Sequence, residues 1–478
     1  MKTTDDFPRV MDRRLFLSVL AAGLLSFTGV VIETAMNVTF PTLMKEFSVS
    51  ISTVQWITTG YLLMLSIVIP ASAFLKKRFS AKRIFITANL IFSAGTIMGY
   101  WSPSFSVLLL GRLLQGAGTG LALPLMFNIV MEQAPLEKIG FMMGAATLTI
   151  AMAPAIGPSV GGWIVQDFGW RMIFAALLPV LVFSLACGAS SIRQSSVIQK
   201  TKFPLFTYLW LAVGFSCFIL ASSFAGEWGW SDVRVLGLFA GSIACLFVFA
   251  RISVHALQPL IHLQVFRIPA FSLCVSGLLL LQFICLGLGF LIPNYAQIVL
   301  TEKAFVSGCI LLPGCLLGAL LAPVSGKLLD RFGARRPLMA GCVFVCLAMT
   351  GFNMTLDEAS VPLMAAVYAI FTLGQGFTSG NTLVAGLSAL PAELKADGNA
   401  VFNTLQQLAG AIGTAIVAAV VSMPRSQFPN NLEAATAMGS HYAFMLLLGM
   451  AVLQWLCLGR AVRNSTKNKK KEKLSISY

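Results

Sequence analysis

The chain has few charged residues. Only 11% of its 478 residues are Asp, Glu, Lys or Arg, whereas 57% are hydrophobic. A soluble domain carries roughly 25% charged residues and roughly 45–50% apolar ones. This scarcity excludes a soluble fold, because a chain of this length could not hide so much apolar surface with so few charges.

Residues that carry catalysis or bind nucleotides are also scarce. The three His residues, His255, His262 and His441, stand near membrane boundaries and form no ligand cluster. There is no G-x-x-x-x-G-K-[ST] loop to hold ATP phosphates. We interpret the ten Cys, which lie mostly in apolar stretches, as packing residues rather than metal ligands or disulfides. The sequence therefore predicts no metal, no cofactor and no enzyme.

Apolar stretches of about 20 residues dominate what remains, and that length crosses roughly 30 Å of hydrocarbon as a helix. Lipid offers the backbone no hydrogen-bond partner, so the stretches must be helical. The first begins like a signal peptide but runs on to Pro41 and contains Glu33, so we interpret it as a span. We predict an all-α integral membrane protein with about 14 transmembrane helices. The expected spans are 14–41, 52–75, 82–101, 105–131, 138–164, 170–191, 204–226, 233–254, 270–298, 304–329, 336–355, 360–389, 398–422 and 440–462.

The basic residues predict the orientation of these spans, because Lys and Arg collect in cytoplasmic loops. With the N-terminus inside, 27 of the 33 basic residues fall in cytoplasmic segments or at the adjoining span ends, five fall at the outer side and Arg112 alone lies deep within a span. Both termini are therefore expected in the cytoplasm, in a multi-pass plasma membrane protein of bacterial type. The basic C-terminal tail predicts contact with anionic lipid. Scattering of the charges over many loops argues against nucleic acid.

Two parts of the chain resemble each other. AFLKKRFSAKR (73–83) matches GKLLDRFGARR (326–336), QGAGTG (115–120) matches QGFTSG (375–380), and AIG (155–157) matches AIG (411–413). The common order predicts two six-helix halves in the same orientation, with a site between them and spans 7 and 8 as an insert, written 6+2+6. The expected parts are a cytoplasmic N-terminus (1–13), an N-terminal bundle (14–191), an inserted helix pair (204–254), a C-terminal bundle (270–462) and a basic cytoplasmic tail (463–478).

Four motifs stand in these spans. Arg112 opens R-x-x-Q-G-x-G in span 4, and Asn37 opens NVTFP at the end of span 1. A glycine- and proline-rich signature in span 5 consists of Pro154, Gly157, Pro158, Gly161 and Gly162. A loop motif, G-x-L-x-D-R-x-G-R-R, is partial after span 2 and more complete after span 10; its residues are Arg78, Arg83, Gly326, Asp330, Arg331, Gly333, Arg335 and Arg336.

On these motifs the chain resembles the major facilitator superfamily. It is more narrowly similar to the fourteen-span drug:proton antiporter branch, the EmrB/QacA-like multidrug exporters. The resemblance implies efflux of small amphipathic compounds in exchange for protons, by rocking of the two halves. It also implies a cytoplasmic gate at the loop motif and a coupling role for Arg112.

Glu33 and Arg112 are the candidates for proton coupling. Glu33 is the one carboxylate well inside a predicted span, where an acid is costly unless it is paired, protonated or facing water. The family acid would fall at Ile32, one residue earlier. Arg112 and Glu33 lie roughly 10 and 12 Å below the outer helix ends at 1.5 Å per residue. We expect them to interact, directly or through water. The alternatives are a structural polar Glu33, and an Arg112 that snorkels or binds backbone carbonyls.

Two further motifs could move during transport. The Pro154–Gly162 run permits a kink and close helix approach. It is expected to close the inner end of the path, with plain tight packing as the alternative. Asp330 and Arg331 could form a charge latch that holds one access state, or simply cap a helix end.

The predicted substrate wall consists of aromatic and amide residues, which suit loosely held amphipathic molecules. Its members are Asn37, Gln55, Trp56, Tyr61, Gln282, Asn294, Gln297, Asn381, Asn403, Gln406 and Gln407. Open alternatives are export of one dedicated metabolite, lipid or antibiotic, a uniporter, and a non-transporting receptor or scaffold. The expected partners are the substrate, protons and membrane lipids, and the protein is expected to be a monomer.

Overall fold

The computed structural model describes residues 12–135, 139–194, 203–256, 262–356, 358–391, 394–428 and 431–476, and these residues are almost entirely helical. A helix overlaps every predicted span. The elements are α1 (Arg13–Ala35), η2 (Met36–Thr39), α2 (Phe40–Phe47), α3 (Ile51–Val54), α4 (Trp56–Arg78), α5 (Ala81–Tyr100), α6 (Phe105–Gln133), α7 (Ile139–Phe168), α8 (Arg171–Ser191), α9 (Leu205–Trp228), α10 (Val233–His255), η4 (Leu263–Arg267), α11 (Pro269–Ile298), α12 (Ala304–Cys309), α13 (Leu312–Phe332), α14 (Arg335–Thr355), α15 (Val361–Ser388), α16 (Lys395–Ser422), η6 (Met423–Ser426) and α17 (Leu432–Ile476).

Within the described residues, twelve helical segments are long and apolar enough to cross a membrane. Helices α5 and α7 are not among the twelve. The prediction of an all-helical, multi-pass membrane protein is therefore confirmed. The count of fourteen crossings stays a prediction.

Serine side chains cap the starts of several helices, and a glycine ends α9, so short turns can join these helices. The Ser50, Ser80 and Ser104 hydroxyls accept hydrogen bonds from backbone N–H groups in the first turns of α3, α5 and α6. Such caps satisfy donors that a helix start leaves unpaired. Gly229 has φ of 91° and ends α9, a backbone conformation that glycine adopts without strain. The chain can then reverse at once into α10.

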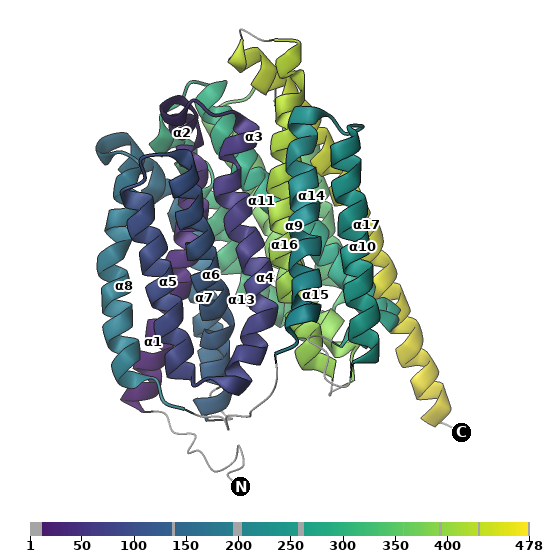
Figure 1. Cartoon of the computed structure of the whole chain (residues 1–478). Helices are drawn as coiled ribbons and strands as arrows, with labels where there is room; N and C mark the ends of the chain where they lie inside the picture. The colour runs from purple at the N-terminus through teal and green to yellow at the C-terminus, as the bar shows by residue number, and fades with distance from the viewer. Residues whose placement is uncertain are drawn as a thin grey trace.

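Two groups of helices form the molecule (Figure 1). In the first helix group α1 and α4–α8 pack on one another, and in the second α11 and α13–α17 do so. Close contacts between glycines join α5 to α6 in the first group and α14 to α15 in the second. A Cβ on Gly111 would lie 2.8 Å from the Gly95 oxygen, and one on Gly374 would lie 2.7 Å from the Gly341 oxygen. Small residues of this kind let helix backbones approach closely in a membrane.

Two seams join the groups. Helix α4 packs on α16, and α7 packs on α12 and α13. The sequence repeat relates α4 to α13 and α7 to α16, so it maps one seam onto the other. A two-fold axis between parallel halves would produce this arrangement. The 6+2+6 division of the chain stays a prediction.

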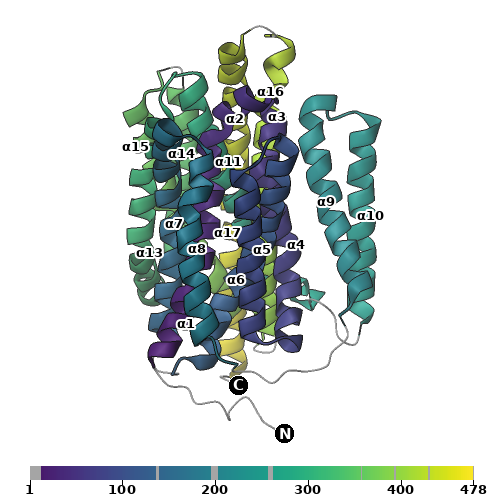
Figure 2. The ribbon, with the colours of Figure 1, turned by 60° about the vertical axis from the view of Figure 1, so that its left-hand side comes forward.

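The hairpin of α9 and α10 covers one of the two seams. The two helices pack on each other, and α9 also contacts both α16 and α4. Figure 2 shows the hairpin at one side of the bundle. Leu211, Phe215 and Ile219 of α9 join a buried apolar cluster with Leu65 of α4 and Leu408 of α16. The hairpin therefore touches both helix groups.

The two ends of the bundle differ in burial. We call the end with the start of α1 and the end of α17 the terminal end, and the end with α2 and α3 the far end (Figure 1). Every residue from Val31 to Phe40 is buried, whereas Leu20, Leu24 and Phe27 of α1 are half-buried. In α11, residues 290–296 are all buried and Gln282 is half-buried. Both central helices are thus sealed toward the far end.

Candidate functional site

Arg112 joins three helices of the first group. Its side chain is fully buried on α6. Its Nε donates to the Ile57 carbonyl on α4 at 3.0 Å, and its Nη1 donates to Gln115 Oε1 at 2.8 Å. Gln115 in turn donates to Thr96 Oγ1 on α5 at 2.9 Å. The alternative that Arg112 binds a backbone carbonyl is what the structure has, although Nη2 has no partner among the described residues.

Tyr61 connects Arg112 to α1. The guanidinium carbon lies 4.4 Å from the centre of the Tyr61 ring, a favourable cation–π contact. The Tyr61 hydroxyl donates to the Gly29 carbonyl on α1 at 2.8 Å and lies 2.9 Å from Thr119 Oγ1. Predicted as a substrate residue, Tyr61 is instead buried inside the first group, where it holds α1, α4 and α6 together.

Glu33 lies one helical turn after Gly29 on α1. Its side chain is 6% exposed, and within the described residues it forms no hydrogen bond or ion pair. Its charge interacts with that of Arg112. The predicted matching depth agrees with this proximity, but no direct ion pair forms between them. The Nε and Nη1 donors of Arg112 go to Ile57 and Gln115 instead.

A neutral polar cluster lies in the second group. Gln375 Nε2 lies 3.1 Å from Cys285 Sγ, and Cys315 Sγ lies 3.6 Å from the Tyr368 hydroxyl. We call Cys285, Cys315, Tyr368 and Gln375 the second-group cluster. Sequence reasoning missed it by treating the cysteines as packing residues, although Gln375 is the repeat counterpart of Gln115.

The α7 signature packs on α1 beside Glu33. A Cβ on Gly157 would collide with Thr34 Oγ1 and lie 2.8 Å from the Val31 oxygen. A Cβ on Gly161 would lie 2.7 Å from Ala35 Cβ. These contacts are possible only without side chains, so tight packing is one role of the motif.

A neighbouring face of the signature contacts α12. A Cβ on Gly162 would lie 2.8 Å from Phe305 Cα, and the Pro158 carbonyl meets Gly308. Pro158 is buried and Pro154 is half-buried. The motif lies toward the far end, because α12 follows the far end of α11 and contacts η2. Its expected role in closing the inner end of the path stays a prediction.

The predicted gate residues lie at the terminal end. Arg78 is the last residue of α4 and lies 5.8 Å from the Phe79 ring, and Arg83 stands in the first turn of α5. Gly333, with φ of 72°, separates α13 from Arg335 at the start of α14. Gly326, Asp330 and Arg331 belong to the last turns of α13, and the side chain of Asp330 lies outside the described structure. The charge latch therefore stays a prediction.

An ion pair in the first group was not predicted. Lys76 Nζ pairs with the Glu132 carboxylate, which ties the end of α4 to the end of α6. Lys76 stands in the basic run of the loop motif, and Glu132 stands alone at the end of span 4. The sequence signal for this pair was therefore the lone acid beside a basic loop.

Several predicted substrate residues are used to join elements. Gln55 Nε2 donates to Ser223 Oγ on α9 at 3.0 Å, and Trp56 packs in the apolar cluster beside the hairpin. Asn37 accepts from Thr58 at 2.7 Å. Gln297 Nε2 donates to the Val38 carbonyl at 2.9 Å, which links α11 to η2 at the far end. The hydrogen bonds and packing of these residues hold neighbouring elements together.

Other predicted substrate residues belong to the second group. Gln406 Nε2 donates to Gln282 Oε1 at 3.1 Å, and both side chains are half-buried. Asn294 and Asn381 are buried and donate to the Phe290 carbonyl and to Ser325 Oγ. Asn403 is exposed and donates to a carbonyl of its own helix. The structure thus joins Gln282 with Gln406 and leaves the others apart.

Comparison with known proteins identifies the family. The sequence profile of the Major Facilitator Superfamily matches residues 19–414. The lincomycin resistance protein LmrB of Listeria monocytogenes is 35% identical over 455 residues, covering 93% of this chain and 95% of the relative. A multidrug resistance protein B homolog of Mycobacterium tuberculosis is 27% identical over 436 residues, covering 90% and 80%.

Solved structures share the fold. A bacterial homolog of the human lysosomal transporter Spinster, in an inward-facing and unoccupied conformation, superposes with a TM-score of 0.70. Its sequence is 14% identical, and the match covers 96% of this chain and 99% of that one. The sequence matches and the structural match each cover most of the chain. The chain belongs to the Major Facilitator Superfamily of membrane transporters.

Proposed function

We propose that the protein exports small amphipathic compounds, drugs among them, in exchange for protons. The relatives named for lincomycin and multidrug resistance support the substrate class. The observation that carries the proposal is Glu33, a buried acid without a hydrogen-bond partner among the described residues. It lies one turn before Asn37, whose amide nitrogen would be 3.7 Å from a Cβ on Gly289 of α11. An acid at such a depth is costly unless it is paired, protonated or facing water.

Arg112 links the release of the Glu33 proton to the binding of substrate. The ionised carboxylate is favoured by the nearby guanidinium, and the neutral form is favoured by burial. A substrate that brings polar or cationic groups to Glu33 favours loss of the proton. A proton arriving from the opposite side then favours release of the substrate. Arg112 is held in place for this by Ile57, Gln115 and Tyr61.

The α7 signature can transmit the change to the seam between the groups. It packs on α1 through Gly157 and Gly161, and on α12 through Gly162. A shift of α1 when Glu33 changes charge would therefore move the contact that seals the far end. In the alternating-access cycle that we propose, this form has its far end closed, since α1 and α11 are wholly buried there.

The proposed topology is fourteen spans as 6+2+6, with both termini cytoplasmic. It is supported by the helix that overlaps each predicted range, by the packing of two groups, and by the basic residues that gather at one end. The terminal end would then face the cytoplasm, and the tail from residue 463 would contact anionic lipid. An inward potential of 100 mV supplies roughly 2.3 kcal/mol per proton.

Transport in inside-out vesicles with an acidic interior tests the proposal. Lincomycin and the fluorescent cation ethidium serve as probes, and a pH dye inside reports proton loss. The native protein should release protons when either probe is added, and Glu33→Gln should abolish this release. Glu433→Gln, an exposed acid at the start of α17, is the matched control and should behave as the native protein.

Each alternative gives its own result in the same assay. Accumulation of a probe without proton release indicates a uniporter. Proton release for one compound out of a broad panel indicates a dedicated exporter of a metabolite, lipid or antibiotic. Absence of any transport would favour a receptor or scaffold. Proton release that is unchanged in Glu33→Gln would sink the proposed coupling.

A further inference from the structure

Two glutamines form a hydrogen-bonded pair where α11 packs on α16. Gln406 Nε2 donates to Gln282 Oε1 at 3.1 Å, while Gln282 Nε2 and Gln406 Oε1 have no hydrogen-bond partner among the described residues. Both side chains are half-buried, so a ligand can reach them, unlike the fully buried amide of Gln454. The pair therefore presents one free donor and one free acceptor.

The pair stands at the inner end of a polar side of α16. Asn399, Asn403 and Gln406 follow one another at intervals of four and three residues, which places them on the same side of the helix. The two asparagines are exposed, Gln406 is half-buried, and Gly410, which is next on this side, is buried. Exposure thus decreases from the terminal end toward the far end, and it stops just beyond the amide pair.

The pair also lies on the side of α11 that is turned toward the first helix group. The half-buried residues Gln282, Cys285, Leu286 and Gly289 fall on one side of this helix. A Cβ on Gly289 would lie 3.7 Å from Asn37 Nδ2 of η2. Polar side chains within a membrane bundle face its interior or water, because lipid cannot pair with them. The free donor and acceptor are therefore placed between the two groups, where a transported compound would pass.

A free amide donor and a free amide acceptor select a ligand by hydrogen bonding rather than by charge. A secondary amide or a hydroxyl group offers the complementary acceptor and donor. Cys285, one turn further along α11, belongs to the uncharged second-group cluster, so the surroundings add no charge of their own. A compound without such groups leaves the amides unpaired, and a site built for hydrogen bonding discriminates against it.

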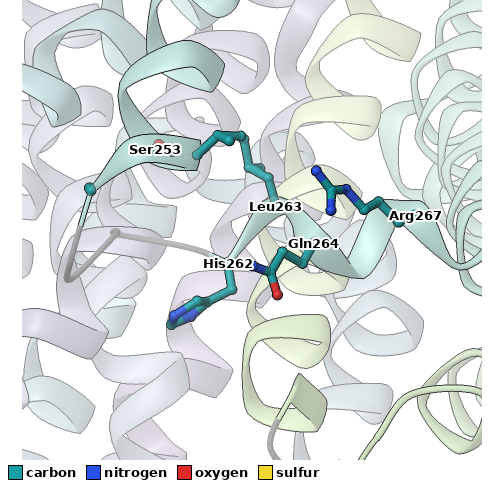
Figure 3. A pocket seen from close by; sticks show the side chains of 7 residues that line it. Ser253, His262, Leu263, Gln264 and Arg267 are labelled. Carbon is teal, nitrogen blue, oxygen red and sulfur yellow. The ribbon is translucent and has the colours of Figure 1, made fainter.

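The amide pair is separate from a small pocket at the terminal end of the hairpin (Figure 3). That pocket is lined by residues of α10 and η4, among them Gln264 and Arg267, and its volume is about 90 Å³. A drug-sized compound needs roughly 300–1,000 Å³. The pocket is therefore too small for the exported compound, and the contacts that select it are sought on α11 and α16.

We propose that the Gln282–Gln406 pair is the contact that selects exported compounds carrying an amide or hydroxyl group. Gln282 Nε2 donates to a carbonyl or hydroxyl oxygen of the compound, and Gln406 Oε1 accepts from its N–H or O–H. This inference rests on the proposed export function and names the substrate class of that path. Cations without hydrogen-bonding groups bind without using the pair.

Equilibrium binding to the purified, full-length protein in neutral detergent tests the pair. Isothermal titration calorimetry would be recorded with lincomycin, which has a secondary amide and sugar hydroxyls, and with tetraphenylphosphonium, a cation that forms no hydrogen bonds. Methionine keeps the length of glutamine without its amide. Gln282→Met and Gln406→Met should each raise the Kd for lincomycin about tenfold. Both variants should bind tetraphenylphosphonium within about twofold of the native protein.

Gln427→Met, which changes an exposed amide after η6, is the matched control and should bind lincomycin as the native protein does. Thermal unfolding of each variant shows whether it is folded. Unchanged lincomycin binding in Gln282→Met and Gln406→Met would overturn the inference, as would an equal loss for both probes or a native protein that binds no lincomycin. Binding requires no proton exchange, so the expected binding without proton release in vesicles would contradict the export mechanism alone.

Discussion

The first and second helix groups share their packing but differ in charge. Gly157 of α7 lies against α1, and its repeat counterpart Gly413 of α16 lies against α11, where a Cβ would be 2.5 Å from the Phe283 oxygen. The chemistry at depth is not shared. The first group buries Glu33 and Arg112, whereas the second-group cluster has thiols, a phenol and an amide.

The counterparts of the two charges are uncharged. The matched segments are offset by 253, 256 or 260 residues, which places Leu286, Gly289 or Pro293 opposite Glu33. The offset that pairs Gln115 with Gln375 places Thr372 opposite Arg112. A symmetric scaffold therefore carries an asymmetric site. We infer that the first group handles the proton and the second group shapes the choice of substrate.

The largest effect is expected from Arg112→Lys. An ammonium cannot reach the Ile57 carbonyl and Gln115 together or stack on Tyr61 as a planar guanidinium does. Proton-coupled ethidium transport in vesicles should fall about 100-fold, since hydrogen bonds to a buried charge are each worth roughly 1.5–3 kcal/mol. Thr372→Val, at the counterpart position, should cost less than about threefold. Full activity of Arg112→Lys would break the asymmetry.

Alanine substitution of Gly157 and of its repeat counterpart Gly413 should distinguish a role in helix packing from a role in proton coupling. Gly157→Ala and Gly413→Ala each push a Cβ into a neighbouring helix and should lower stability by about 1–3 kcal/mol. We expect Gly157→Ala also to lower transport about tenfold, because α1 carries Glu33. Protons released per ethidium exported, measured with a pH dye, should stay native in Gly413→Ala. Gly449→Ala, with no atom within 4 Å of the added Cβ, is the control. Equal uncoupling in both variants would contradict this division.

A smaller effect is expected from Cys285→Ala in the second-group cluster. The change removes the partner of Gln375 in that cluster. The concentration of ethidium needed for half-maximal export should change about threefold to tenfold, while proton release continues. Cys346→Ala, a half-buried thiol outside the cluster, should leave export unchanged. A loss of proton release in Cys285→Ala would place coupling in both groups.

The smallest effect is expected at the hairpin. Ser223→Ala removes the acceptor of Gln55 and should cost about 1 kcal/mol of stability, the usual net value of such a bond. Thermal unfolding of the purified protein would measure it. Ser190→Ala, an exposed hydroxyl bonded within its own helix, is the control. If Ser223→Ala is as stable as the control, the hairpin is held by apolar packing alone.

Part of the site could be predicted from the sequence because helix geometry is regular. Counting residues from the helix ends placed Arg112 and Glu33 at one level, and their interaction in proton coupling stays a prediction. The choice of partners could not be predicted. Whether Arg112 faces Glu33 or the Ile57 carbonyl depends on how each helix is rotated about its axis. The rotation of the chain about its axis at Gln55 likewise turns this side chain toward Ser223 of α9.

Composition and periodicity by themselves determined that the chain is a helical membrane protein, because lipid forces every long apolar stretch to satisfy its own backbone. They also determined the repeat and the rarity of buried charge. Only the tertiary structure decided that Tyr61 stands beside Arg112, that the α7 signature packs on α1 and α12, and that Cys285 and Cys315 stand in the second-group cluster. Those features arise from contacts between helices distant in sequence, and close packing rather than local propensity selects them.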